Sequence, residues 1–385
     1  MGREKLRILH LIPNLYRGGA ERMALDMVSY LREAGQTEVV LATLQDENGY
    51  QAEYPEIHPV ITRSRVIPSL SGKWTVETGG YEKLLRELKP HIVHSHLYEA
   101  EWVAHYRPRP EIAYFTHCHD NMRQLRPLTR ADWSSKVRWT EAYERFHLLR
   151  AYLKVPPCFL AISPDTQTYF QQVLPKALRG KIVQLDNAID VSRFLPFQAR
   201  YRKSPFTIAN IGSFVAKKNQ RFLLDIAEAC RSRNLDVRVE MYGDGPLRQQ
   251  LLSEIELRNL TDFVSAPGQL PEVQKYLQQA QAYVHTATYE PFGLVIIEAM
   301  ACGLPVLALD GHGNRKLHAQ GENGWMFSAQ DANAFADKLL ALSQEQDLWT
   351  HCSKGALATA QQFDFKPYTE KLLSLYHQAV LEKGN

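Results

Sequence analysis

The chain has 385 residues, of which 45% are hydrophobic and 23% are charged, with 21 glycines and 20 prolines. This composition is typical of a globular protein and excludes disordered, collagen-like and disulfide-scaffold proteins. With 45 Lys and Arg against 42 Asp and Glu, the formal net charge of +3 does not indicate a nucleic-acid partner. The length predicts two or three domains, each with its own core.

The five cysteines are scattered and include no C-x-x-C pair, which favours a reducing compartment. The apolar run near the N-terminus is short for a signal peptide, and we find no stretch of about 20 apolar residues. We therefore expect a cytoplasmic protein.

Short apolar runs alternate with helical patterns along the chain. In the first half we expect a helix over 19–32 and strands at 6–12, 38–44, 91–95, 112–116, 159–163 and 182–185. After a polar, basic join at 198–204 the pattern restarts, with strands expected at 206–212, 237–243, 263–266, 282–286 and 306–309. Such alternation predicts parallel sheets covered by helices on both faces.

One sheet of about twelve strands would be unusually large, so two units are expected. The predicted fold is α/β, with two Rossmann-like, doubly wound domains at 1–190 and 191–365 facing each other across a cleft. We expect the final helix, within 366–385, to pack back on the N-terminal domain. Ligands of such sheets bind beyond the carboxyl ends of the strands, so we searched the loops that follow strands.

Three loops are candidates for a bound phosphate or sugar. Gly18 and Gly19 open the first helix, where a ligand can approach the backbone closely, although a plain tight turn would also explain them. Lys218 follows the first strand of the second domain, where it could neutralise a phosphate or be an ordinary solvated lysine.

The third loop holds a pair of carboxylates, Glu290 and Glu298, on either side of Phe292, Gly293 and Leu294. We expect 292–294 to form the first helical turn, with free N–H groups. A carboxylate among apolar residues needs hydroxyl or amide partners, and sugars and ribose supply hydroxyls. The alternative is one glutamate at a helix N-terminus and one on the surface.

Histidines follow two strands, at His91, His94 and His96 and again at His117 and His119. Residues two apart in a strand share a face, so the two H-x-H pairs could converge. Together with Asp120 they could bind zinc, but H-x-H alone is a weak signal, and we favour hydrogen bonds to substrate or a packed turn. The absence of any D-x-D sequence argues against a divalent ion holding a diphosphate.

Residues 121–154 carry eight basic and three acidic residues interleaved with aromatic ones. This pattern suits an anionic membrane surface or an anionic acceptor, unless it is a core helix with solvated arginines. The basic candidates are Arg123, Arg126, Arg130, Lys136 and Arg138.

Taken in order, these residues resemble retaining glycosyltransferases of GT-B architecture, specifically glycosyltransferase family four. The resemblance covers nearly the whole chain. Its motifs are GGAER (18–22), IVHSH (92–96), THCHD (116–120), DNAIDVSRF (186–194), GSFVAKKNQ (212–220), GDGPL (243–247), E-x7-E (290–298) and GENG (321–324).

The resemblance implies a nucleotide-diphosphate sugar, UDP- or GDP-linked, bound by the second domain. Glu298 would then hold the ribose and Glu290 the donor sugar, while Lys218 would offset diphosphate charge. The backbone N–H groups at 292–294 would meet the phosphates or sugar, and Gly18 and Gly19 would face the donor phosphate and the acceptor. His119, with His117 as its rival, would contact the donor sugar. Ser213 stands where the family usually has an arginine; either Lys217 or Arg221 replaces its charge, or phosphate binding is weaker.

The resemblance also implies sugar transfer to an acceptor hydroxyl with retention, without a metal ion or other cofactor. The acceptor is expected to be a glycan or a lipid-linked molecule in bacterial surface polysaccharide or glycolipid synthesis, with the protein peripheral on the inner face of the cytoplasmic membrane. A nucleotide-sugar epimerase, a phosphorylase, a glycoside hydrolase and a non-catalytic nucleotide-sugar-binding subunit remain alternatives.

Overall fold

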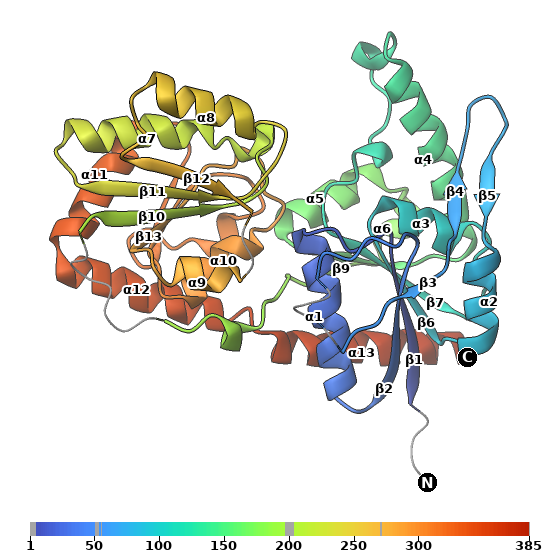
Figure 1. Cartoon of the computed structure of the whole chain (residues 1–385). Coiled ribbons are helices and arrows are strands. Elements are labelled where there is room, and N and C mark those ends of the chain that lie inside the picture. Colours follow the sequence, from blue (N-terminus) through green and yellow to red (C-terminus); the bar gives the residue numbers. More distant parts are fainter. Residues whose placement is uncertain (1–4, 51–53, 55, 197–203, 270–271, 385) are drawn as a thin grey trace. The chain divides into compact units, whose positions relative to one another are not determined.

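The computed structural model describes residues 5–50, 54, 56–196, 204–269 and 272–384 (Figure 1). The chain forms two compact units. The first unit comprises Met1–Ala188 and Phe365–Asn385, and the second comprises Ile189–Asp364. Each unit contains one parallel sheet, which confirms the predicted fold class.

The first unit contains a seven-stranded sheet in the order β3-β2-β1-β6-β7-β8-β9, and every neighbouring pair is parallel. Its strands are β1 (Leu6–Ile12), β2 (Thr37–Thr43), β3 (Val60–Ile61), β6 (Ile92–His96), β7 (Ala113–Cys118), β8 (Cys158–Ala161) and β9 (Ile182–Gln184). The central strands are almost entirely buried because helices cover both of their faces, although β6 (IVHSH) and β7 (AYFTHC) carry polar residues in their second halves.

Helices of the first unit present apolar faces to this sheet. In the first helix, for example, Met23, Met27 and Leu31 recur at helical spacing and are buried. The helices are α1 (Gly19–Glu33), α2 (Gly79–Leu88), α3 (Tyr98–His105), α4 (Lys136–Lys154), α5 (Pro164–Val173), α6 (Lys176–Arg179) and α13 (Phe365–Gly384), with short 3-10 turns η1 (Arg123–Leu125) and η2 (Arg130–Asp132). The last of these, α13, packs on α1 and β7 within the first unit.

The edge strand β3 and the hairpin that follows it in the first unit were not predicted. A two-stranded antiparallel hairpin, β4 (Arg65–Ile67) and β5 (Thr75–Glu77), follows the short edge strand β3. These strands have two or three residues each, which is too short for a periodic signal in the sequence.

Within the described part of the chain, no helix is both long enough and apolar enough to cross a membrane.

The second unit contains a six-stranded parallel sheet in the order β12-β11-β10-β13-β14-β15. Its strands are β10 (Phe206–Ile211), β11 (Val237–Tyr242), β12 (Val264–Gly268), β13 (Ala282–His285), β14 (Val306–Leu309) and β15 (Gly324–Phe327). The last strand was not predicted, because its sequence, GWMF, reads as the end of a glycine turn.

Helices also cover the second sheet. They are α7 (Arg221–Ser232), α8 (Arg248–Leu257), α9 (Val273–Leu277), α10 (Leu294–Ala301), α11 (Ala332–Gln344) and α12 (Gln346–Gln361), with 3-10 turns η3 (Val191–Arg193), η4 (Ala216–Lys218) and η5 (Arg315–Leu317). A side-chain cap fixes the start of α11, where Asp331 accepts hydrogen bonds from the backbone N–H groups of Asn333 and Ala334.

The strand orders create one switch point in each sheet. In the first unit, β1 lies between β2 and β6, so the chain leaves in opposite directions from β1 and β6. In the second unit, β10 lies between β11 and β13 in the same way. Ligands of doubly wound sheets bind at the carboxyl ends of such strands, and this places the predicted loops where a site is expected.

Candidate functional site

A partly buried ion pair lies at the switch point of the second sheet. Lys218, at the end of η4 after β10, forms a charge-assisted hydrogen bond with Oε2 of Glu290, in the loop after β13. The same oxygen is 3.0 Å from Nε2 of His285, the last residue of β13. Because Glu290 is separated from Lys218 by 72 residues, only the sheet order brings the two together.

Electrostatics hold Glu290 in its ionised form. Burial by itself would raise the pKa of the carboxyl group, but Lys218 and the hydrogen bond to His285 more than offset this, and the pKa falls to about 2. Burial lowers the pKa of His285 and outweighs the opposing effect of Glu290. The cluster therefore presents one anionic carboxylate and one lysine cation at the sheet edge.

Backbone hydrogen bonds fix the loops that carry this pair. The hydroxyl of Thr286 donates to the carbonyl oxygen of Lys218 at 2.9 Å, and the N–H of Glu290 donates to the carbonyl oxygen of Gly311 at 2.9 Å. The side chain of Asn314 then holds the 309–311 segment through both its oxygen and its nitrogen. The positions of Lys218 and Glu290 are thus set by three loops of one sheet.

The second carboxylate, Glu298, is buried within α10. The expected first helical turn at 292–294 is wrong in its start, because α10 begins at Leu294. Gly293 caps the helix with φ of 105°, a conformation that favours glycine, and Phe292 precedes the helix with its ring packed against Phe363. The first N–H with an acceptor inside the helix is that of Ile296, which donates to the carbonyl oxygen of Gly293 at 3.0 Å, so the amides of Phe292, Gly293 and Leu294 stay predicted donors to a ligand.

The glycine loop GDGPL lies beside the lysine loop. A Cβ atom added at Gly243 would lie 2.0 Å from the carbonyl oxygen of Gly212, so no side chain fits there. The N–H of Phe214 also donates to the carbonyl oxygen of Asp244 at 2.9 Å. These contacts keep the loop after β10 close to the loop after β11.

The structure favours one of the two residues predicted to replace the charge that is missing at Ser213. Ser213 is exposed, and its carbonyl oxygen accepts a hydrogen bond from the side chain of Gln220. Arg221 forms an ion pair with Glu254 at 2.7 Å, so its charge is already paired. Lys217 is exposed and remains the candidate to supply the missing charge.

Gly18 and Gly19 lie at the start of α1, in the first unit. Gly18 is the N-cap residue, and the hydroxyl of Tyr50 bonds both its N–H at 2.9 Å and its carbonyl oxygen at 2.8 Å. Gly19 is exposed as the first helical residue. Tyr50 was not predicted, because nothing in the local sequence links it to Gly18.

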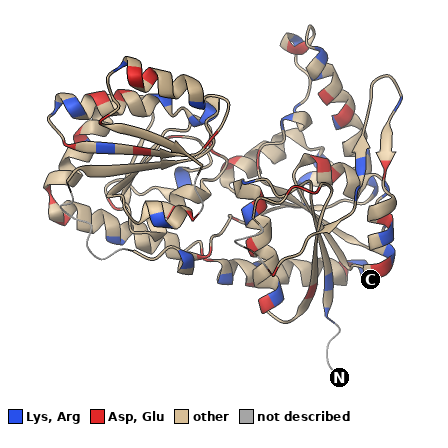
Figure 2. Ribbon diagram, viewed as in Figure 1, with Lys and Arg blue, Asp and Glu red and all other residues tan. Residues whose placement is uncertain are grey.

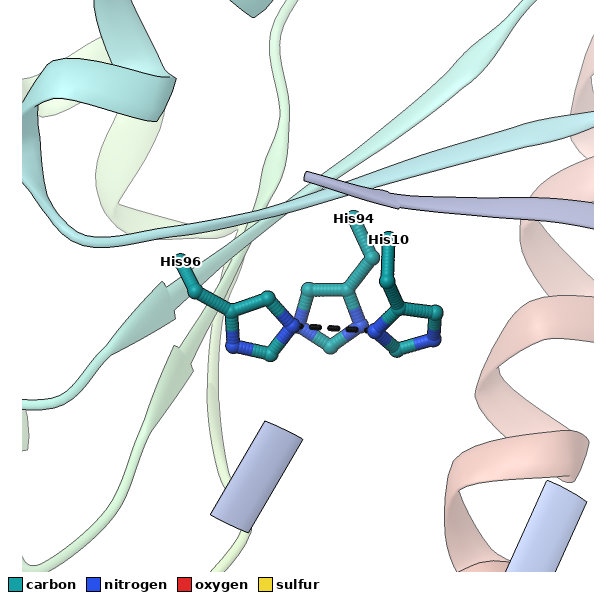
Figure 3. Close-up of side chains that lie close together, drawn as sticks. All are labelled: His10, His94 and His96. Atoms are coloured by element: carbon teal, nitrogen blue, oxygen red, sulfur yellow. Dashed lines mark hydrogen bonds between the residues drawn. The ribbon is translucent and has the colours of Figure 1, made fainter. Parts of the chain in front are cut away.

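Five histidines gather at the switch point of the first sheet. The structure brings together both H-x-H pairs, His94 and His96 from β6 with His117 and His119 at the end of β7, and adds His10 from β1. Figure 3 shows His10, His94 and His96 side by side, with a 2.9 Å hydrogen bond between His10 and His96. A polar residue in the apolar run 6–12 was the signal for His10 that sequence reasoning missed.

His91 does not join this cluster. It precedes β6 at the opposite end of the strand, where its ring nitrogens contact Arg7. Among the described residues, two groups could hold a metal ion: His10, His94 and His96, and His96, His117 and His119. The expected ligand Asp120 belongs to neither group.

Several basic residues of the 121–154 segment form ion pairs within the fold. Arg138 is buried, pairs with Asp132 and Glu141, and donates to the carbonyl oxygens of Arg126 and Pro127. Arg126 also pairs with Asp132, and Arg123 pairs with Glu141. Of the five predicted basic candidates, Arg138 is therefore unavailable to a ligand, because its charge stabilises the turns before α4.

Figure 2 shows basic and acidic residues of both units interspersed. Around η2 and α4 the exposed residues include aromatic, aliphatic and basic ones. Trp133, Val137 and Phe146 are exposed, as are Arg130 and Lys136. This surface, which we call the α4 surface, lies in the first unit.

Together, the two parallel-sheet domains and their switch-point residues define a protein of the GT-B fold class. Two family models match consecutive parts of the chain, Glycosyltransferase Family 4 over residues 17–193 and Glycosyl transferases group 1 over residues 192–358. The chain belongs to this glycosyltransferase family.

Curated relatives share 23–32% identity in matched segments. The putative glycosyltransferase EpsF of Bacillus subtilis is 24% identical over 80% of both chains. The poly(ribitol-phosphate) alpha-N-acetylglucosaminyltransferase of Staphylococcus aureus is 27% identical over 53% of this chain and 43% of its own length. This chain thus spans about half the length of several curated relatives that it matches.

Solved structures show the same fold. HepE of Anabaena, in complex with UDP, superposes with a TM-score of 0.74 at 18% identity over 97% of this chain and all of that chain. TarM superposes with a TM-score of 0.76 at 14% identity, over 97% of this chain and 99% of that chain.

Proposed function

We propose that the protein is a retaining glycosyltransferase that moves a sugar from a UDP- or GDP-sugar to an acceptor hydroxyl without a metal ion or other cofactor. The observation that carries this proposal is the Lys218–Glu290 pair beside His285 at the switch point of the second sheet. Family membership and the fold shared with UDP-bound HepE support it.

Charge is the chemical difficulty in this reaction, because the leaving diphosphate becomes more negative as the sugar becomes oxocarbenium-like. We assign Lys218 to the diphosphate, where a fixed cation stabilises charge that grows in the transition state. Backbone amides of Phe292, Gly293 and Leu294, which precede and open α10, would add hydrogen bonds to the same oxygens. With these groups in place the reaction requires no divalent ion.

Carboxylates would hold the hydroxyl groups of the donor. Glu290, ionised at neutral pH, can accept hydrogen bonds from sugar hydroxyls near the reacting carbon, and Glu298 can accept those of the ribose. In the first unit we assign His119 to the donor sugar in preference to His117. His117 is fully buried, with both ring nitrogens bonded to His94 and Asn187, whereas His119 is partly exposed.

The acceptor is proposed to be a glycan or a lipid-linked molecule of bacterial surface polysaccharide or glycolipid synthesis. The relatives support this class, since they include putative colanic acid glycosyltransferases of Escherichia coli and Salmonella typhimurium and a phosphatidyl-myo-inositol mannosyltransferase of Mycobacterium leprae. We further propose that the protein works on the inner face of the cytoplasmic membrane, where a lipid-linked acceptor would be presented.

The α4 surface supports a contact with anionic lipid. Trp133 is 72% exposed and Phe146 is 55% exposed, and Arg130 and Lys136 are exposed on the same segment. Aromatic side chains enter the lipid interface, and each nearby cation contributes about 1 kcal/mol. Vesicles with anionic lipid should retain the protein at low salt, and R130Q/K136Q should reduce retention, whereas purely zwitterionic vesicles should not bind. Equal retention by both vesicle types would overturn the contact.

The function is tested by a thermal-shift screen of UDP- and GDP-sugars followed by a transfer assay. A ligand at 100 times its dissociation constant stabilises the protein by about 2.7 kcal/mol, so the donor should be visible in the screen. Activity should survive EDTA, and NMR of the product should show the anomeric configuration of the donor.

The remaining alternatives give other products in the same assay. An epimerase would change the free nucleotide sugar without an acceptor, a hydrolase would release free sugar from a glycan, and a non-catalytic subunit would bind donor without turnover. Failure to bind any nucleotide sugar would contradict the transferase.

A further inference from the structure

The histidines of the first unit form one continuous hydrogen-bonded chain. It begins at Oδ1 of Asn187, 3.1 Å from Nε2 of His117, and continues from Nδ1 of His117 to Nε2 of His94 at 3.3 Å. The hydroxyl of Tyr376, on α13, then joins Nδ1 of His94 at 2.5 Å to Nε2 of His10 at 3.4 Å.

The second half of the chain leads outward. Nδ1 of His10 lies 2.9 Å from Nε2 of His96, and Nδ1 of His96 lies 2.9 Å from Nε2 of His119. His10, His94, His96 and His117 are fully buried, and His119 alone of the five is partly exposed. The chain therefore connects a buried amide to one histidine at the surface of the sheet edge.

Hydrogen-bond chemistry gives the chain a direction. The Oδ1 atom of Asn187 can only accept, so His117 must donate from Nε2 and leave Nδ1 as an acceptor. A neutral imidazole has one donor and one acceptor nitrogen. His94 therefore donates from Nε2 to His117 and accepts at Nδ1 from the Tyr376 hydroxyl. His10 then donates from Nε2 to that hydroxyl and accepts at Nδ1 from Nε2 of His96, whose own Nδ1 accepts from His119. At the end of the chain, His119 donates from Nε2 and its Nδ1 carries only a lone pair.

Electrostatics agree with neutral rings. Burial, helped by His117 and Arg32, lowers the pKa of His10 to about 3. Burial lowers the pKa of His117 to about 4, against the hydrogen bond to Asn187, and it holds the pKa values of His94, His96 and His119 well below their ordinary range.

A metal ion explains the same geometry less well. Two imidazole nitrogens on one tetrahedral zinc ion lie about 3.3 Å apart, because each Zn–N bond is about 2.0–2.1 Å. The His10–His96 and His96–His119 separations of 2.9 Å are instead typical of hydrogen bonds. Both ring nitrogens of each of the four buried histidines already have a partner in the chain.

We propose that this chain locks His119 in the Nε2–H tautomer, so that its Nδ1 atom accepts a hydrogen bond from a hydroxyl group of the bound sugar. His10, His94, His96, His117, Asn187 and Tyr376 are then positioning residues, and His119 is the residue that touches substrate. The assignment rests on the proposed function. It specifies a neutral acceptor, which suits a hydroxyl group and offers nothing to a phosphate oxygen.

The substitution Tyr376→Phe tests the hydrogen-bonded histidine chain by removing a single hydroxyl group. It removes the one hydroxyl that links His94 to His10, so the direction set at Asn187 no longer reaches His119. Tyr368→Phe is the matched control, because Tyr368 is also buried on α13 and its hydroxyl has no hydrogen-bond partner among the described residues.

The first measurement is the tautomer of each histidine in the free protein, from long-range ¹H–¹⁵N correlation spectra. We expect Nε2–H for His119 in the unmodified protein and in Y368F, and a mixture of tautomers in Y376F. An Nδ1–H or charged His119 in the unmodified protein, or stoichiometric bound zinc, would overturn the proposal.

The second measurement is steady-state transfer from the donor found in the screen. Loss of one neutral hydrogen bond to the sugar corresponds to a fall in kcat/KM of about fivefold in Y376F, with Y368F unchanged. Equal activity of the two variants would overturn the role of the chain. If the protein transferred no sugar at all while His119 remained Nε2–H, the proposed function and the role of His119 in it would fail, but the tautomer would stand.

Discussion

Lys218 and Glu290 form an ion pair that joins the loop after β10 to the loop after β13. Their side chains are 19% and 10% exposed, so the pair is largely shielded from water yet reachable from one side. His285, the last residue of β13, forms a hydrogen bond with the carboxylate of Glu290. This arrangement fixes a cation and an anion at the place where a doubly wound sheet binds its ligand.

Replacement of Lys218 by methionine should lower kcat of transfer by about 10²–10³-fold, because a preorganised cation facing the leaving group is lost. The measurement is steady-state kinetics with the donor that binds. Lys275→Met, which removes an exposed lysine paired within its own helix turn, is the control and should leave kcat unchanged. Full activity in K218M would refute the assignment of Lys218 to the diphosphate.

Glu290 should make stability depend on acid pH. Its folded-state pKa of about 2 lies below the ordinary 4.5, so its contribution is complete above pH 4.5 and is lost as the pH falls towards 2. The full contribution is about 3 kcal/mol at most. Urea unfolding between pH 6 and pH 3 should therefore show a shallower pH dependence in E290Q than in the unmodified protein. Parallel curves would contradict the shift.

Arg138→Gln should destabilise the first unit by about 3 kcal/mol, because it leaves Asp132 and Glu141 without their shared buried partner. Arg130→Gln, at an exposed position eight residues earlier, should change stability by less than about 0.5 kcal/mol. Denaturant unfolding of the two variants measures the difference. A stable R138Q variant would return Arg138 to the list of ligand-binding candidates.

Gly243→Ala should impair transfer more than a single methyl group ordinarily does. The new Cβ would lie 2.0 Å from the carbonyl oxygen of Gly212, at a residue with φ of 150°, so the loop before Lys218 must move. We expect kcat/KM to fall by at least about tenfold. Gly180→Ala, where the added Cβ meets nothing within 4 Å, is the control. Unaltered kinetics in G243A would show that this close approach does not matter for the site.

Glu298→Gln should weaken nucleotide binding and leave the chemical step less affected. A hydrogen bond to a charged acceptor is worth about 1.5–3 kcal/mol, so the Kd for UDP or GDP should rise by about tenfold or more. Isothermal titration calorimetry gives the Kd directly. Glu322→Gln, at an exposed carboxylate paired with His351, should bind as the unmodified protein does, and a matching Kd in E298Q would exclude the ribose assignment.

Local sequence patterns predicted the strands that matter for the site. The runs at 6–12 and 306–309 coincide with β1 and β14, and most other strands differ by one or two residues at their ends. They were predictable because helices cover both sheet faces, which makes most of these strands short and largely apolar. The edge strand β3, the hairpin β4–β5 and the strand β15 lacked such a run.

The partners of the site residues were not predictable. His285 and Tyr376 read as ordinary members of an apolar strand and helix, yet one bonds Glu290 and the other completes the histidine chain. Arg138 was predicted as a candidate to contact an acceptor or membrane but is buried against Asp132 and Glu141. In each case the deciding contact depends on how separate elements pack.

The sequence by itself determined the two parallel sheets, the loops that carry the chemistry, and the family to which the chain belongs. Periodicity and strand-end motifs are local properties, so they can be read one segment at a time. Only the tertiary structure decided that His10 stands beside His94, that Lys218 meets Glu290, and that Phe292 lies outside α10. Strand order and register bring these residues together across tens of residues, and no local pattern records them.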